Sequence, residues 1–180
     1  MALRQIIPCT DARMTKPSDT VFEITDEVRA LCFDMVDTML LAEGAGLAAV
    51  QVGVPLRIFT MIDLPDVGLP VQDAMVDRPK LILINPTFVD KSEDMIEMPE
   101  GCLSMPGVFF PVRRHREVTV EYQDIHGRMQ SLSGKGYKAI CLQHEMDHLD
   151  GVRNIDRVSP LKRAMLLKKH QDNVRRMKRA

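Results

Sequence analysis

The chain of 180 residues is 45% hydrophobic and 27% charged, and its formal net charge is −1. These values are those of an ordinary globular protein with one domain and a hydrophobic core of its own. No apolar run approaches the ~20 residues of a membrane span, and the first residues lack the hydrophobic region of a secretory signal, so we expect a cytoplasmic protein without a membrane partner.

The first predicted element is a helix that begins after Thr25 and ends at Gly44. Thr25 suits the N-cap position, and the two acidic residues that follow it suit the positive end of the helix dipole. A glycine such as Gly44 is a common helix terminator. One face of this helix carries only apolar and sulfur-containing side chains and is expected to lie in the core: Val28, Leu31, Cys32, Met35 and Met39.

Several short segments rich in branched apolar residues come next and are predicted strands. Residues 56–63 and 81–86 form two of them, and residues 64–80, with three prolines, form a long surface loop between the two. Residues 117–124 alternate in polarity and lead through a turn into residues 128–134, which together predict a hairpin.

Two helices are predicted in the last third of the chain. Residues 137–149 form one, with Gly151 as its stop, and the second starts after Ser159 with Pro160 in its first turn. Strands grouped apart from helices, without regular βαβ alternation, predict an α+β fold. We expect antiparallel or mixed sheets around the 137–149 helix, followed by a C-terminal helix.

This C-terminal helix is strongly basic. Residues 160–180 contain eight lysines and arginines and one acidic residue, Asp172, so a charge of +7 in this segment is balanced by about −8 elsewhere. Such an uneven distribution of charge bears on which partners the protein binds. Two interpretations stay open: a docking surface for an acidic partner, and a helix whose charged face is merely solvated.

The 137–149 helix carries a metal-binding pattern, HExxH. His144 and His148 are four residues apart, so both imidazoles can face one ion, and Glu145 can reach a water molecule on that ion without being a ligand. The ion lowers the pKa of such a water towards ~7 and makes a nucleophile available at neutral pH. The alternative for this stretch alone is a charged helix without a metal.

A catalytic metal of this kind usually has three protein ligands, so a third is needed. The four cysteines are scattered and, without an export signal, are expected to be free thiols. Cys141 lies seven residues from His148, ~10 Å along the helix axis, and is more suited to line the site. Cys102, which follows Gly101 in the sequence EGCLS, is modestly favoured as the third ligand.

A third segment contributes small residues and an amide. Residues 44–53 read GAGLAAVQVG, in which glycines and alanines would let the backbone approach an extended substrate. The side-chain amide of Gln51 could donate a hydrogen bond to an oxyanion. Taken alone, this segment is better explained as a helix terminus followed by a strand.

Together these three segments resemble the peptide deformylase family, hydrolases that remove formyl groups from new proteins beginning with formylmethionine. The family pattern of GxGLAAxQ, EGCLS and QHExDHL is complete here at residues 44–51, 100–104 and 143–149. The resemblance implies a metallohydrolase catalytic domain over residues 1–159, with residues 160–180 as a basic C-terminal helix of the same domain. Two departures bear on substrate preference: the length of loop 64–80, and Met98–Pro99 before EGCLS.

The resemblance also assigns roles to individual residues. It implies Cys102, His144 and His148 as metal ligands and Glu145 as general base and acid. The Gln51 amide and the backbone N–H of Leu103 would stabilise the oxyanion. The implied substrate-binding residues are Ala45, Gly46, Gly101, Tyr137, Ile140 and Cys141, of which Gly46 would bind extended peptide through its main chain. From their positions beside the motifs, we also expect Glu100 and Arg114 to pair and to steady the cysteine segment.

The cofactor and partners follow from the same resemblance. The family suggests Fe(2+) as the physiological metal, while Zn(2+), Ni(2+) or Co(2+) would fit the same ligand types. The expected partners are formylated nascent peptides, with no DNA and no membrane. The basic segment 160–180 resembles the extension that attaches some bacterial members to the ribosome. A metalloprotease would leave the first two motifs unexplained, and a ribosome-binding protein with a vestigial site would be expected to lack a ligand or the base.

Overall fold

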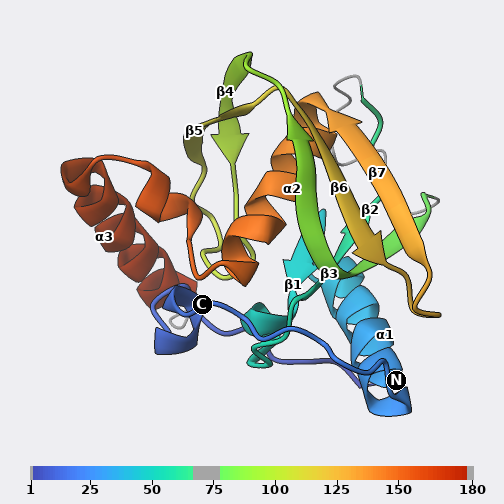
Figure 1. Ribbon diagram of the computed structural model, residues 1–180. Helices are drawn as coiled ribbons and strands as arrows, with labels where there is room; N and C mark the ends of the chain where they lie inside the picture. The colour runs from blue at the N-terminus through green and yellow to red at the C-terminus, as the bar shows by residue number, and fades with distance from the viewer. Residues whose placement is uncertain (1, 67–77, 178–180) are drawn as a thin grey trace.

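The computed structural model describes residues 2–66 and 78–177 and has an α+β fold, as the sequence predicts (Figure 1). A five-stranded sheet is antiparallel throughout, in the order β1 (Gly46–Ala48), β2 (Ile58–Ile62), β3 (Lys80–Lys91), β6 (Glu117–Gln123) and β7 (Met129–Lys135). A separate antiparallel hairpin consists of β4 (Met95–Glu100) and β5 (Phe110–His115).

The predicted strands and helices are present, although β3 continues to Lys91, well beyond its expected end at residue 86. The expected segments 56–63, 81–86, 117–124 and 128–134 correspond to β2, β3, β6 and β7. The two later helices are α2 (Gly136–Leu149) and α3 (Pro160–Met177), and Gly151, at φ 72°, follows the end of α2 as expected. Most of the loop expected at 64–80 lies outside the described residues.

Helix α1 (Asp26–Leu41) begins as predicted and ends differently. The Thr25 hydroxyl accepts a hydrogen bond from the Val28 N–H, the bond of an N-cap. The left-handed residue that ends the helix is Glu43, at φ 53°, and not the expected Gly44. Gly44 instead allows the close approach of Leu103, since a Cβ there would lie 2.5 Å from Cδ1 of Leu103.

The β4–β5 hairpin is the element that the sequence analysis did not predict. Its alternation is hidden because Pro99 and Pro111 face each other in the register and because Arg114 occupies a buried position in β5 where an apolar side chain would be expected. The hairpin matters for the site because β4 ends at Glu100, immediately before the segment that contains Cys102.

Helix α2 is the central element of the fold. It lies between the large sheet and the β4–β5 hairpin, and nearly all of its residues from Ala139 to Leu149 are buried (Figure 1). Its polar side chains His144, Glu145 and His148 are therefore held inside the protein. A helix that buries such groups needs partners for them or a functional reason for their burial.

The hydrophobic core has two parts. The larger one joins α1, the five-stranded sheet and the sheet-facing side of α2, and it contains the predicted α1 residues Leu31, Cys32, Met35 and Met39. The smaller one lies beneath α3 and joins it to the segment after Cys102; its buried members are Cys9, Met105, Val108, Phe110, Val112, Ile155 and Leu166. Among the described residues no helix has the length and apolar character needed to cross a membrane.

Candidate active site

Two segments that are distant in the sequence meet at the candidate site. Cys102 lies on the segment after β4, and His144 and His148 both belong to α2. The sulfur and one ring nitrogen of each histidine lie within 4.8 Å of one another. The structure thus brings together the three residues expected to be ligands, and Cys141 is not part of this group.

Each histidine presents one nitrogen to the same space. The Nδ1 atom of His144 is 2.9 Å from Oε2 of Glu100, an arrangement in which Nδ1 carries the proton and Nε2 keeps its lone pair for an ion. The Nε2 atom of His148 is 3.4 Å from the sulfur of Cys102. The two rings meet edge to face, with centroids 4.8 Å apart and planes at 87°.

This donor set fits a divalent transition-metal ion. One thiol and two imidazoles are the ligand types that zinc, iron(II), cobalt and nickel accept, and three protein ligands leave a position for water. Burial lowers the pKa of His148 well below its usual value, with help from His144 and Arg114, so its ring is neutral as a ligand must be.

The pKa of His144 shifts in the opposite direction. Burial lowers it, but hydrogen bonds to Cys102 and Glu100 outweigh burial and hold it well above the usual value. A proton on this ring is therefore favoured while no cation occupies the group, which is the behaviour of a site that a metal ion would complete by displacing protons.

Glu145 is buried beside this group and points towards strand β1. Its Oε2 atom has no hydrogen-bond partner among the described residues, and a Cβ added to Gly46 would lie 2.5 Å from its Oε1 atom. Burial raises the pKa of Glu145 to about 7, with His144 lowering it and Glu100 raising it. A carboxyl group that titrates near neutrality is suited to accept and return a proton.

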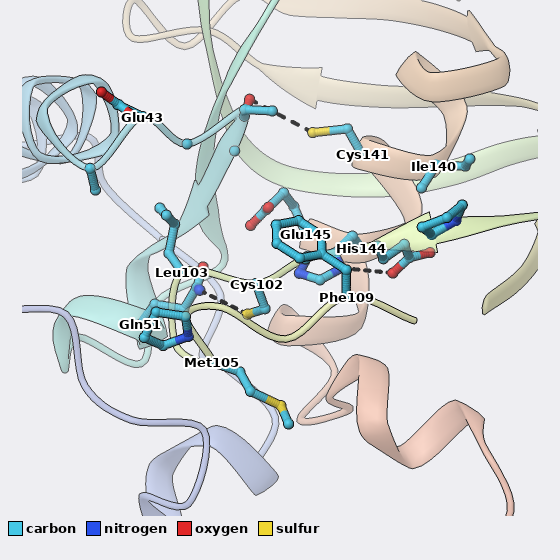
Figure 2. Close-up of a pocket in the computed structure, with 18 of the residues that line it drawn as sticks. Glu43, Gln51, Cys102, Leu103, Met105, Phe109, Ile140, Cys141, His144 and Glu145 are labelled. Carbon is cyan, nitrogen blue, oxygen red and sulfur yellow. Dashed lines mark hydrogen bonds and ion pairs between the residues drawn. The ribbon is translucent and has the colours of Figure 1, made fainter. Parts of the chain in front are cut away.

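Gln51 reaches the site from the short helical turn Ala49–Val52, which follows β1. Its Oε1 atom accepts a hydrogen bond of 2.8 Å from the Ala48 N–H, which fixes the orientation of the amide. Its Nε2 atom donates to the Ser104 hydroxyl at 3.1 Å and approaches the Cys102 sulfur at 3.5 Å (Figure 2). The Gln51 amide nitrogen is thus shared between Ser104 and the sulfur of the proposed ligand, and it lies where an oxyanion donor would be needed.

A buried ion-pair network holds the cysteine segment and α2 together. Arg114 makes a two-point contact with Glu100, at 2.6 and 3.0 Å, so the expected pair is present. Its third contact, which the sequence analysis did not anticipate, is 2.5 Å to Oδ2 of Asp147 on α2. Although burial alone would raise the pKa of Glu100, its bonds to Arg114 and His144 lower it to about 2.

A cavity of about 1050 Å³ opens beside these groups (Figure 2). It is lined by every residue expected to bind substrate: Ala45, Gly46, Gly101, Tyr137, Ile140 and Cys141. The Cys141 thiol donates to the Ala45 carbonyl at 3.7 Å, and burial raises the pKa of this thiol well above its usual value, so Cys141 is a neutral wall residue. Leu103 and Gln51 line the same cavity.

Several cavity residues were missed in the sequence analysis. Glu43 and Phe109 line the cavity, and the side chain of Phe109 is 68% exposed. Its ring lies against Gly101, where a Cβ would come within 2.5 Å of the ring. Neither residue belongs to a motif, and only the glycine next to Cys102 offered a signal that something packs closely there.

Comparisons with known proteins find similar chains over nearly the whole sequence. The family model described as polypeptide deformylase matches residues 3–164. The chain is 43% identical over 169 residues to the peptide deformylase of Afipia carboxidovorans, with 94% of each chain covered. It is 42% identical over 173 residues to that of Rickettsia akari, with 94% of this chain and 95% of the relative covered.

Solved structures give the same result. A peptide deformylase from Legionella pneumophila is similar with a TM-score of 0.88 and 36% identity, over 99% of both chains. A second, from Ehrlichia chaffeensis in complex with actinonin, has a TM-score of 0.85 and 34% identity, over 96% of this chain and 98% of the other.

Proposed function

The chain belongs to the polypeptide deformylase family, and from this membership we propose its reaction and the role of each residue in the cavity. The reaction is the metal-dependent hydrolysis of the N-formyl group on the formylmethionine of newly made polypeptides, with release of formate. The observation that carries the residue assignment is the group of one thiol and two imidazoles within 4.8 Å, beside a buried Glu145 and at the wall of a cavity.

Cys102, His144 and His148 would hold the metal ion. When bound, a divalent ion at such a site lowers the pKa of a water molecule towards ~7 and polarises a carbonyl oxygen. We assign iron(II) as the metal in the cell, following the family, and expect zinc, nickel or cobalt to bind the same ligands in isolated protein. Glu100 fixes the orientation of the His144 ring through their 2.9 Å contact.

Glu145 would transfer the proton. Its carboxylate accepts a proton from the attacking water and delivers it to the nitrogen of the leaving amine, so one group serves as base and then as acid. Its burial and its pKa of about 7 support this assignment. The Gln51 amide and the Leu103 backbone N–H would donate hydrogen bonds to the oxygen of the formyl group as negative charge develops on it.

The substrate would bind as an extended peptide along the edge of β1. Among the described residues this strand pairs with β2 alone, so the main chain at Gly46 is positioned to add a further strand. Tyr137, Ile140 and Cys141 lie on the α2 face that lines the cavity and would contact the methionine side chain. The small residues Ala45 and Gly101 leave room for the peptide at the rim.

The test is formate release from a formyl-Met tripeptide, with protein purified without oxygen and loaded with iron(II). Rapid release is expected from the wild type, and none from Glu145→Gln with the same metal content. The unformylated tripeptide serves as a substrate control, because a metalloprotease would cleave it. Absence of formate release from wild type of confirmed metal content would overturn the proposal.

We also propose that the basic helix α3 docks on ribosomal RNA in the cytoplasm. Lys168, Lys169, Arg175 and Arg176 are exposed, and phosphate contacts would make binding weaken as salt rises. Replacing Lys168 and Lys169 by glutamate should reduce co-sedimentation with ribosomes at low salt.

The matched control for docking changes the same charge elsewhere. Lys91 and Arg116 are exposed and lie outside α3, so their double replacement by glutamate should leave co-sedimentation unchanged. Equal loss in both double variants would mean that overall charge, and not α3, determines binding.

A further inference from the structure

We propose that Arg157 is a positioning residue for the metal ligand His144, although the two side chains do not touch. The proposal rests on the metal site described above. Arg157 ends the short helical turn Asn154–Arg157, which lies between α2 and α3 and contacts β5. Arg157 is the first member of a series of contacts between charged side chains, and the last contact is with the Nδ1 atom of His144.

The first link joins Arg157 to helix α2. Its Nε atom lies 3.0 Å from Oδ2 of Asp147, and its terminal NH2 group contacts Oδ1 of the same carboxylate. Such a two-point contact fixes orientation as well as distance. Asp147 is buried and immediately precedes the ligand His148, while the Arg157 side chain is 46% exposed. This contact therefore joins a partly exposed arginine to a buried carboxylate.

The following links lie wholly inside the protein. Asp147 contacts Arg114 at 2.5 Å, and Arg114 holds Glu100 at 2.6 and 3.0 Å. Glu100 in turn contacts Nδ1 of His144 at 2.9 Å. Each side chain in this series has both of its neighbours within hydrogen-bonding distance, and Asp147, Arg114 and Glu100 are all less than 10% exposed.

The charges explain why the outer member is needed. The interior of the network holds two carboxylates, Glu100 and Asp147, and only one arginine, Arg114. A buried charge without a full partner is costly, so two carboxylates would compete for one guanidinium. Arg157 supplies the second positive charge on the side of Asp147. Arg114 is then free to keep its two-point contact with Glu100, which orients His144.

The same residue also connects the site to the C-terminal helix. Arg163 of α3 donates to the Ile155 carbonyl at 3.1 Å and pairs with Asp156 at 3.4 Å, so the turn that carries Arg157 is fixed to α3. A suitable control is Arg128, between β6 and β7, which contacts Asp124 at 2.9 Å and shares no partner with Arg157 among the described residues.

The test compares cobalt(II) retention in four proteins: the wild type, Arg157→Gln, Arg157→Lys and Arg128→Gln. Release to an excess of chelator is followed by loss of the cobalt–thiolate absorption, and the spectrum before release reports the geometry of the ligands. Release should be about 10-fold faster in Arg157→Gln, since losses of 10- to 100-fold are typical when an outer partner of a ligand is removed. Arg157→Lys should fall in between, because lysine keeps the charge but not the two-point contact.

A charge-balancing double variant makes the test independent of the single variant's stability. In Asp147→Asn/Arg157→Gln the network keeps one carboxylate for one arginine, so cobalt release should return towards the wild-type rate. Release from Arg157→Gln at the rate of the wild type and of Arg128→Gln would overturn the inference. Failure of the wild type itself to give a cobalt–thiolate spectrum would instead overturn the proposed metal site, and the two failures are thereby distinguished.

Discussion

Gly46 lies so close to Glu145 that no side chain fits between them. A Cβ there would be 2.5 Å from Oε1, 2.8 Å from Cδ and 2.9 Å from Cγ of the glutamate. We predict that Gly46→Ala moves the carboxylate and lowers kcat about 100-fold, because misplacement of a catalytic group by about 1 Å has that effect. Metal content should not change, since Glu145 is not among the three ligands.

The measurement for Gly46→Ala is formate release together with metal analysis of the same sample. Unchanged kcat would show that the carboxylate position has no influence on the reaction. A parallel loss of metal would instead indicate that the substitution disturbs the whole of α2.

The hydrogen-bond donor and the hydrogen-bond acceptor of the Gln51 side chain can be tested independently by substitution. Its Oε1 atom is occupied by the Ala48 N–H, while its Nε2 atom faces the site. Gln51→Glu keeps the acceptor and loses the donor, so we predict that it lowers kcat about 100-fold or more, as does Gln51→Ala. KM should change little. Steady-state kinetics on a formyl-Met peptide decide this, and a Gln51→Glu enzyme with wild-type kcat would exclude an oxyanion role for the amide.

The sequence predicted which three residues come together, but not the residues that surround them. The spacing of His144 and His148 follows from helix geometry, and the resemblance of EGCLS to the family motif implied Cys102, which the structure places beside both histidines. The contacts of Asp147 could not be found, because they join residues 33 and 10 positions apart and depend on how the β4–β5 hairpin and the turn before α3 pack. Local patterns carry no information about such pairings.

Among the elements, the hairpin β4–β5 shows where sequence patterns fail. Strands are predicted from alternating apolar residues, whereas here prolines and a buried arginine occupy the strands. Four of the five strands in the large sheet were predicted, and three of these, β2, β3 and β6, contain the branched apolar residues that are typical of strands. The element that supports the metal site is thus the one whose sequence is least typical of its structure.

Asp34 of α1 holds the N-terminal segment through hydrogen bonds, and these bonds predict that the stability of the fold depends on pH. Asp34 accepts hydrogen bonds from the Ala2 N–H at 2.7 Å and from Arg4 at 2.8 and 3.0 Å. These bonds lower its pKa below the ordinary 3.8. A lowered pKa in the folded state means that this carboxylate contributes stability above about pH 4 and that the contribution disappears as pH falls through the folded-state value.

Urea denaturation between pH 7 and pH 2.5 tests this attachment. The wild type should lose stability more steeply below about pH 4 than Asp34→Asn, which has no charge to lose at this position. All other carboxylates are common to both proteins, so they cancel in the comparison. Parallel pH profiles would show that the bonds to Ala2 and Arg4 do not stabilise the fold.

At the scale of the whole molecule, α3 is joined to the site through the smaller core. Leu166 of α3 packs in the same cluster as Met105 and Val108, and Cys102 packs against its edge. Residues 160–180 were expected to belong to the same domain as the catalytic residues. If they do, loss of packing beneath α3 should destabilise the entire protein in one cooperative transition.

Leu166→Ala is the variant that tests this coupling, and Leu161→Ala is its control. Leu166 is 9% exposed, so truncation to alanine should lower the free energy of unfolding by about 2 kcal/mol or more. Leu161 lies on the same helix but is 75% exposed, and its truncation should change stability by less than about 0.5 kcal/mol. Chemical denaturation followed by circular dichroism and by cobalt–thiolate absorption should give coincident transitions in both variants. Two separate transitions in Leu166→Ala would mean that α3 unfolds independently, and the basic helix would then be an appendage and not part of the catalytic domain.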